Sequence, residues 1–355
     1  MRGLLSIAVP SFFFVFAGCG GTDSVDDGAS TSSGSSSGHT VEADGGSSSS
    51  SSSGSSSGDA PSSSSGGSSS SSGNVSGPFA CPSGTTESTV RVVAGNISNG
   101  NAQSYDDGSG LRIFKGLDAD VALVQEMNYR QNRPVDLAEF VQHGFGDGFV
   151  YHRGGPNTNG AIPNGIVSRY PFVRDEGGQP IAGEGQDSQV NGTRTFVWAR
   201  IDIPGDQDLV AISVHLATNA SKRGAEVTEL LALVEQIAHD GDLLVLGGDF
   251  NTDSRSATGI AEMSGTFVTT GPYPVDEDGK DGTNINRSKP YDWVVGNPEL
   301  HARSRTTFIG EEPFVSGLVF DSRVWSDLSL VPPVLRDDSR AHQHMAVVRT
   351  FAVCE

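Results

Sequence analysis

From residue 90 onward, the chain alternates between short apolar runs and polar or glycine-rich segments. Many of the runs are almost wholly apolar, a pattern typical of strands that are buried on both faces. The predicted strands are residues 90–93, 121–124, 164–168, 195–203, 209–214, 243–246 and 291–295. Pro204 and Gly205 connect two of them, which predicts an antiparallel pair.

Apolar residues at helical spacing predict a short helix over residues 106–117 and an amphipathic helix over residues 223–239. Residues 251–291 are rich in Gly, Asp and Thr and are expected to form a long loop, and a last strand is expected near Phe351. We find no internal repeat or second domain. Loosely alternating strands and helices therefore predict one mixed α/β domain of layered sheets.

The N-terminal part has a different composition. A basic residue, an apolar stretch and small residues before Cys19 predict an export signal over residues 1–19. Small residues before a cysteine resemble a bacterial lipobox, in which Cys19 would be lipidated; an ordinary signal peptide is the alternative. Residues 20–78 are dominated by Ser and Gly and predict a flexible tether, which leaves residues 79–355 as the globular head.

Cys81 and Cys354 lie near the two ends of the head. In an oxidising compartment they could form a disulfide, and the alternative is two free thiols. The chain carries a net charge of −20; the part before residue 79 holds one basic and six acidic residues, which leaves 22 basic and 37 acidic residues, or −15, in the head. This balance does not favour a broad basic face for nucleic acid. It is consistent with an enzyme that binds an anionic substrate through divalent cations. It is equally consistent with a negative charge that serves only to keep the protein soluble.

Candidate chemistry begins at residues 242–251, where an apolar run ends in Gly247-Gly248-Asp249-Phe250-Asn251. We expect the two glycines to let the backbone leave the sheet. On an extended segment Asp249 and Asn251 would point the same way, at the strand end where α/β sheets bind ligands. An ordinary polar turn is the alternative interpretation.

Other predicted strands end in the same manner. Asn96 follows the first strand, Gln125 and Glu126 follow the second, and His215 follows residues 209–214. A carboxylate directly after an apolar strand is costly unless it is paired or binds a metal, although Glu126 could also be a solvated strand end. For His215 the alternative is a core histidine.

Taken in order, these motifs resemble the endonuclease/exonuclease/phosphatase superfamily, whose fold is deoxyribonuclease I-like. The matching segments are VVAGNI, DVALVQE, NGIVSRYP, VAISVHLA, LGGDFN and YDWVV. The resemblance covers roughly residues 90–353. It implies a four-layered α/β sandwich in which helices flank two packed mixed β-sheets.

By that resemblance, Glu126 is the main Mg²⁺ ligand and Asn96 assists it, with Mn²⁺ or Ca²⁺ as alternative ions. Asp249 and Asn251 hold the phosphate and the attacking water. These roles agree with the chemistry, because hydrolysis of a phosphodiester needs a cation on the phosphoryl oxygens and a positioned water. Hard Mg²⁺ prefers carboxylate and amide oxygens.

The resemblance also implies that His344 is an essential histidine oriented by Asp292, and that His215 lies near the leaving-group oxygen. The family commonly ends in Ser-Asp-His, whereas this chain has His342-Gln343-His344. Gln343 replaces an acid that contributes to metal binding, so metal affinity is expected to be weaker or a second ion excluded. A register in which His342 takes the place of His344 is the alternative.

The resulting hypothesis is an exported, metal-dependent phosphodiesterase, monomeric, that acts as a nuclease on DNA. It would be a bacterial outer-membrane, cell-surface or extracellular protein, attached to the membrane through Cys19 if that residue is lipidated. A sphingomyelinase-like phospholipid hydrolase is the alternative; it needs exposed apolar loop residues, for which Phe145, Phe149 and Tyr151 are candidates, although core packing explains them equally well. A catalytically impaired binding module is the third hypothesis, suggested by Gln343.

Overall fold

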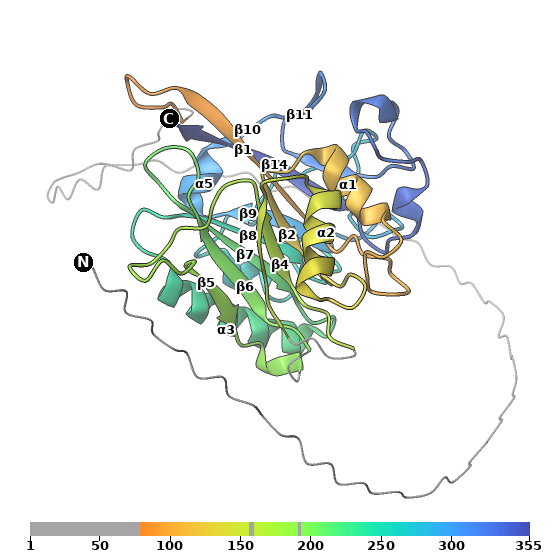
Figure 1. Cartoon of the computed structure of the whole chain (residues 1–355), viewed down its shortest axis with the longest axis horizontal. Coiled ribbons are helices and arrows are strands. Elements are labelled where there is room, and N and C mark those ends of the chain that lie inside the picture. Colours follow the sequence, from red (N-terminus) through yellow and green to blue (C-terminus); the bar gives the residue numbers. More distant parts are fainter. Residues whose placement is uncertain (1–78, 156–159, 191–192) are drawn as a thin grey trace, which may run out of the picture. The chain divides into compact units, whose positions relative to one another are not determined.

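The computed structural model describes residues 79–155, 160–190 and 193–355 (Figure 1). The predicted signal peptide, Cys19 and the tether lie outside the described residues. Within the described part of the chain, no helix has the length and apolarity needed to cross a membrane.

A seven-stranded mixed sheet forms one half of the described fold. Its strands follow in the order β10 (Ser304–Arg305), β14 (Ala346–Cys354), β1 (Glu87–Gly95), β2 (Val121–Val124), β4 (Gly165–Ser168) and β3 (Val150–Arg153), with β13 (Leu318–Phe320) also paired to β14. Only β1 and β2 are parallel neighbours among these pairs.

A five-stranded mixed sheet forms the other half. Its order is β5 (Ala182–Gly185), β6 (Phe196–Ile201), β7 (Leu209–His215), β8 (Leu243–Asp249) and β9 (Asp292–Gly296). Strands β6 and β7 are antiparallel, as predicted, while β7 and β8 are parallel. A separate hairpin pairs β11 (Thr307–Ile309) with β12 (Glu312–Phe314).

Alternating side chains along each strand build the layers. In β1, Val92 belongs to the core between the two sheets, whereas Val93 belongs to the core under the helices of the first sheet. In β8, Val245 faces the core between the sheets and Leu246 the core on the outer face of the second sheet. Because neighbouring side chains point to opposite faces of a strand, strands that are apolar throughout are buried on both faces.

Helices cover the two outer faces, which completes the four layers expected from the resemblance (Figure 1). The first sheet packs against α1 (Ser109–Leu117) and α2 (Pro134–Gly144), the second against α3 (Ala220–Ile237). Two short helices, α4 (Ile260–Met263) and α5 (Pro298–Ala302), complete the set, and α4 is the only helix or strand between residues 251 and 291, in the predicted loop.

Several local expectations need correction. The first helix begins at Ser109 rather than at residue 106, because the Asp107 carboxylate accepts the backbone N–H of Ser109 and turns the chain there. Helix α2 and strands β3 and β5 were not predicted. The two glycines of the LGGDFN motif do not leave the sheet: they are residues of β8, paired with β9.

A lack of space for a larger side chain explains why residues 247 and 248 are glycines. A Cβ on Gly247 would lie 2.7 Å from the carbonyl oxygen of Trp293, and a Cβ on Gly248 would lie 2.1 Å from that of Val214. Gly248 also has a φ of +132°, which other residues rarely adopt. The glycines therefore bring neighbouring strands together directly before Asp249.

The predicted disulfide is confirmed: Cys81 and Cys354 are bonded, with their Cα atoms 5.6 Å apart. The candidate membrane-contacting aromatics instead contribute to the core. Phe145 is buried, and Phe149 and Tyr151 are partly buried against the same cluster under α1 and α2.

Candidate active site

The predicted site residues converge because their strands end at the same edge of the fold. Asn96 follows β1 and Glu126 lies two residues beyond β2, while His215 and Asp249 are the last residues of β7 and β8. Strand β9 runs antiparallel to β8, so its first residue, Asp292, belongs to the same edge. His215 pairs in register with Asp249, and Asp249 with Asp292.

Asp249 is the centre of this group. Its Oδ2 lies 3.2 Å from Nε2 of His215 and 3.5 Å from Nε2 of His344, and it accepts a hydrogen bond of 3.5 Å from Nδ2 of Asn96. Asp249 is 1% exposed. One buried carboxylate oxygen thus contacts side chains from three other parts of the chain.

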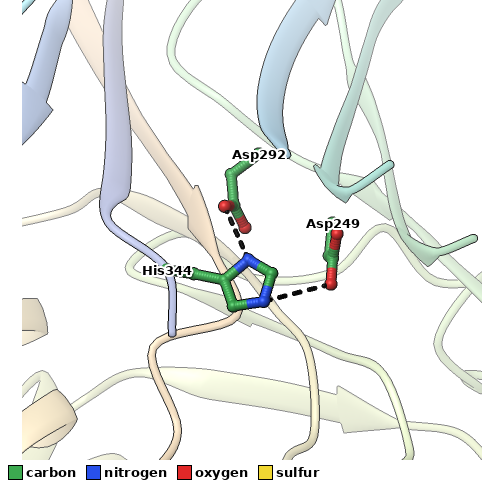
Figure 2. A group of neighbouring side chains, drawn as sticks. All are labelled: Asp249, Asp292 and His344. Atoms are coloured by element: carbon green, nitrogen blue, oxygen red, sulfur yellow. Dashed lines mark hydrogen bonds and ion pairs between the residues drawn. The ribbon is translucent and has the colours of Figure 1, made fainter. Parts of the chain in front are cut away.

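Figure 2 shows His344 between two carboxylates. Its Nδ1 lies 2.9 Å from Oδ2 of Asp292, on the opposite side of the ring from Asp249. The other oxygen of Asp292 accepts the backbone N–H of Asn96 at 3.0 Å. Asp292 therefore fixes both the orientation of the imidazole and the position of the Asn96 backbone.

Burial and charge give the two histidines opposite protonation states. Burial alone would lower the pKa of His344, but the carboxylates of Asp292 and Asp249 outweigh it and raise the pKa to about 10. Burial, followed by the positive charges of Arg194 and His344, lowers the pKa of His215 well below its ordinary value. At neutral pH His344 is therefore a cation and a hydrogen-bond donor, while His215 is neutral.

Burial also raises the pKa of the Asp249 carboxyl, to about 7, against the opposing effect of the charge on His344. The nearby carboxylates of Asp292 and Glu126 raise it further. Three acids and one cationic histidine therefore share a buried site, which leaves an excess of negative charge. Such a site favours a bound cation.

Glu126 and Asn96 form the other half of the site. Nδ2 of Asn96 donates to Oε1 of Glu126 at 3.0 Å, and the hydroxyl of Ser98 donates to Oε2 at 2.5 Å. Glu126 has a φ of +50°, a left-handed conformation that is uncommon for a residue other than glycine. Strained backbone of this kind is often found at functional sites.

Asn251 reaches the site in a way that differs from the expectation. It is not on an extended segment with Asp249, since its φ is +51°. Its backbone N–H donates to Oδ1 of Asp249 at 2.9 Å, and its Nδ2 donates to the carbonyl of Leu216 at 2.8 Å. The tight turn, rather than strand alternation, places Asn251 beside the Asp249 carboxylate.

The choice between the two C-terminal histidines is decided by their contacts. Nε2 of His342 lies 2.8 Å from the hydroxyl of Ser109 in α1, and burial lowers the pKa of His342 to about 4. His342 therefore packs against α1 as a neutral ring, and His344 is the residue that reaches Asp249. Gln343 is exposed, and its Nε2 donates to the carbonyl of Gly100 at 3.3 Å.

The residues present suit a divalent metal ion. Asp249, Asp292 and His344 bring three potential ligand atoms within 4.8 Å of one another. Both nitrogens of the protonated His344 ring, however, already face carboxylates, so this ring is better explained as a hydrogen-bond donor than as a ligand. The oxygens of Glu126 and Asn96, beside the same excess of negative charge, are the donor atoms that a hard cation prefers.

Two residues at this edge, Ser98 and Arg194, were not predicted from the sequence. A third, Gln125, lies in a different place from the one expected. Ser98 is one residue past the recognised VVAGNI motif and could have been found only from its contact with Glu126. Gln125 does not join the site: its Nε2 donates to Ser213 at 2.9 Å, between the two sheets. Arg194, which lowers the pKa of His215, was not noticed because a single arginine in a loop has no distinctive pattern.

Comparisons with known proteins agree with this architecture. The model of the Endonuclease/Exonuclease/phosphatase family matches residues 101–327. This range includes five of the seven predicted site residues, all except Asn96 and His344. No curated protein matches the sequence.

Among solved structures, the chain is similar to the endonuclease/exonuclease/phosphatase from Bacteroides vulgatus, with 11% identity, a TM-score of 0.51, and coverage of 76% of this chain and 100% of that one. A family protein from Leptotrichia buccalis C-1013-b has 15% identity and a TM-score of 0.50 over 75% of this chain and 99% of its own. These similarities concern the fold. Because the family model spans well over half of the sequence, the chain belongs to the endonuclease/exonuclease/phosphatase family, whose members are generally metal-dependent hydrolases.

Proposed function

We propose that the protein is an exported, divalent-metal-dependent phosphodiesterase that cleaves DNA. The observation that carries this proposal is the meeting of His215, His344 and Asn96 at one carboxylate oxygen of Asp249. Glu126 accepts a hydrogen bond from the same amide nitrogen of Asn96. The group combines a cation site, a charged hydrogen-bond donor and a neutral imidazole, which are the parts that phosphodiester hydrolysis needs.

Glu126 and Asn96 would hold the metal, for which Mg²⁺ is the first choice and Mn²⁺ or Ca²⁺ are alternatives. When bound, the ion would neutralise charge on the phosphoryl oxygens and favour attack by water. Ser98 keeps the Glu126 carboxylate in place through its hydrogen bond. This outer contact orients the ligand.

His344 would supply a positive hydrogen-bond donor to the phosphate as negative charge develops in the transition state. Its contact with Asp292 keeps the ring charged and correctly turned. Replacement of either His344 or Asp292 would remove this charged hydrogen-bond donor at neutral pH.

Asp249 would position the attacking water, since it accepts hydrogen bonds and lies between the two imidazoles. Asn251, fixed by its contact with Leu216, would hold a phosphate oxygen. The resemblance to the family places His215 near the leaving-group oxygen. As a neutral ring within a buried site, His215 can relay a proton through its Nε2.

DNA is preferred over phospholipid because the aromatic residues considered for membrane contact are packed into the core. Phe145 is buried, and Phe149 and Tyr151 contact the cluster under α1 and α2. A membrane-cleaving enzyme would need such residues on its surface.

Export remains part of the proposal. The bond between Cys81 and Cys354 supports an oxidising compartment, where disulfides persist. Lipidation of Cys19 and a tether over residues 20–78 would hold the catalytic domain at a membrane, on the outer membrane or the cell surface. Radiolabelled fatty acid incorporated by the wild-type protein and lost in Cys19→Ser would support the anchor; labelling of both or of neither would contradict it.

The activity is tested with the purified full chain, which is offered plasmid DNA and choline-phospholipid vesicles in separate reactions with Mg²⁺. We expect DNA cleavage that EDTA abolishes and that Glu126→Ala and His344→Ala lower by at least about a hundredfold. His143→Ala, at an exposed histidine on α2, is the matched control and should retain activity. Release of phosphocholine without DNA cleavage would overturn the DNA assignment, and no hydrolysis of either substrate would overturn the enzyme.

A further inference from the structure

A cavity of about 570 Å³ opens beside the candidate active site. His215 and Asn251 line it, and the same two residues contact Asp249 or its backbone neighbours at the catalytic centre. The remaining wall comes from the segment between β7 and α3, the first turn of α3, and residues 189, 193 and 194 before β6. A substrate bound at Asp249 would therefore have part of its structure in this cavity.

The charged side chains that line the cavity are cations, in contrast to the acidic chain as a whole. Arg194 and Lys222 line it, and none of its lining residues within the described ranges is an acid. Thr218 and Asn219 add neutral polar groups. In a protein with a net charge of −20, such a site beside the active site calls for an anionic ligand.

Arg194 is a built part of this wall and not a chance surface residue. It is 8% exposed, and it is held by Glu226 and Asp187 at 3.5 and 3.7 Å. The contact with Asp187 is made by the buried Nε of Arg194 and is longer than a hydrogen bond. Glu226 also accepts the backbone N–H of Ala217, so the same contacts fix the segment that follows His215.

The N-terminus of α3 adds to the positive potential. This helix is 18 residues long, begins after Asn219 and has no acidic residue in its first turn. Lys222 lies in that turn and forms no ion pair within the described part of the chain; its Nζ donates only to the carbonyl of Gln189, at 3.3 Å. The helix dipole and an ammonium without a carboxylate partner therefore act on the same space.

Resting on the proposed phosphodiesterase function, we propose that this cavity binds a second phosphate of the substrate, the neighbour of the scissile phosphate in a polynucleotide strand. Arg194 contributes a fixed guanidinium charge to the cavity wall, and Lys222 contributes an ammonium that has no carboxylate partner among the described residues. A single strand presents phosphates in regular succession, so one can occupy the cavity while the next lies at Asp249.

The same cavity disfavours a choline headgroup. A quaternary ammonium is recognised by aromatic faces, but the lining has two cations and, apart from the ring of His215, no aromatic side chain. Like charges would repel the headgroup from Arg194 and Lys222. The inference thus narrows the substrate to one with more than one negative charge.

The test compares the dinucleotide TpT, which has one phosphodiester, with pTpT and TpTp, which carry one additional terminal phosphate on either side. With Mg²⁺ and the full chain, we expect kcat/KM for one of the two phosphorylated forms to exceed that for TpT by about tenfold. Equal kcat/KM for all three would overturn the second-phosphate site.

Lys222→Ala should reduce this preference about fivefold, and Lys222→Glu should abolish it. Lys280→Ala is the matched control, because Lys280 is also an exposed lysine but is paired with Asp278. An unchanged preference in both Lys222 variants would contradict the inference while leaving the phosphodiesterase function intact. Arg194 is not chosen for the first variant, because its buried ion pairs make it a structural residue as well.

If the wild-type chain hydrolyses none of these substrates, the proposed function has failed and binding decides the inference alone. Fluorescence anisotropy with labelled oligothymidylate in EDTA should then show weaker binding by Lys222→Ala, with a salt dependence reduced by about 0.7 in log–log slope. The same affinity and slope as the wild-type chain would overturn the inference. Faster cleavage of choline-phospholipid vesicles than of the oligonucleotides would also overturn it.

Discussion

Replacement of Asp292 by asparagine tests how the site keeps His344 charged. The side chain keeps its size and can still accept the N–H of Asn96, as Oδ1 of Asp292 does now at 3.0 Å. Its amide, however, would donate to Nδ1 of His344 where the carboxylate now accepts at 2.9 Å. The proton must then leave Nδ1, so the imidazole becomes neutral in the other tautomer.

The size of the effect follows from the pKa of His344. That pKa is about 10 in the folded protein against 6.5 for an unperturbed histidine, so the charged ring contributes at most about 5 kcal/mol to stability. Asp249 remains near Nε2 and supplies part of this, and we therefore expect Asp292→Asn to lower the free energy of unfolding by about 3 kcal/mol at pH 6. Because the folded pKa is raised, the contribution is fully present below pH 6.5 and is lost as the pH rises through about 10.

Urea denaturation of the wild-type protein and Asp292→Asn, in EDTA at pH 6 and pH 10, measures this difference. Asp278→Asn, at an exposed carboxylate, is the control, and its difference in stability from the wild-type protein should be the same at both pH values. Histidine NMR should show His344 of the wild-type chain still charged at pH 8 and neutral in Asp292→Asn. An equal loss of stability at both pH values, or a wild-type His344 that titrates below pH 7, would refute the reasoning. In the enzyme assay the same variant should lose about 10³-fold or more in kcat, as expected when a catalytic histidine is left in the wrong tautomer.

Three further predictions concern the metal, the glycines and the disulfide. Glu126→Gln should abolish the heat of Mg²⁺ binding in calorimetry with an unchanged far-ultraviolet circular dichroism spectrum; retained binding would place the metal elsewhere. Gly247→Ala should lower the free energy of unfolding by about 3 kcal/mol, because its Cβ would lie 2.7 Å from a backbone carbonyl of β9, whereas Gly265→Ala, with nothing within 4 Å, should be close to neutral in thermal denaturation. The double variant Cys81→Ser/Cys354→Ser should lose up to about 5 kcal/mol of the free energy of unfolding, because the bond spans 273 residues of sequence and restricts the unfolded chain; a loss below about 1 kcal/mol would contradict this.

The sequence was most informative where strands are apolar on both faces. Residues such as Val93 and Leu246 are buried between layers, so their strands appear as unbroken apolar runs with a distinct polar end. The site residues stand at the ends of those runs, and their order along the chain carries the resemblance to the family, which implied that these residues meet. Strands β3 and β5 were missed because they lie at the edges of their sheets and are only partly buried, so their residues have no clear apolar pattern.

Other features depend on contacts between distant residues, which no local pattern encodes. Gly247 and Gly248 have the composition of a turn, but the close approach of neighbouring strands is what requires them. Asn251 takes its place from a left-handed turn that alternation along a strand would not predict. Arg194 is separated by 32 residues from Glu226, and only the folded chain shows that the pair supports the wall beside His215.

The net negative charge of the chain does not exclude a local site for an anionic substrate. Several of them are neutralised by nearby acids, as in the pairs of Arg112 with Asp338 and Arg200 with Asp242. A broad basic face for nucleic acid is therefore not needed if charge is concentrated where it acts, beside the scissile phosphate. With about two phosphates contacted, the log–log salt slope of single-strand binding would be only about −1.4. Binding of that kind holds a short segment briefly, so the surrounding negative charge would help the enzyme to release the remainder of the strand.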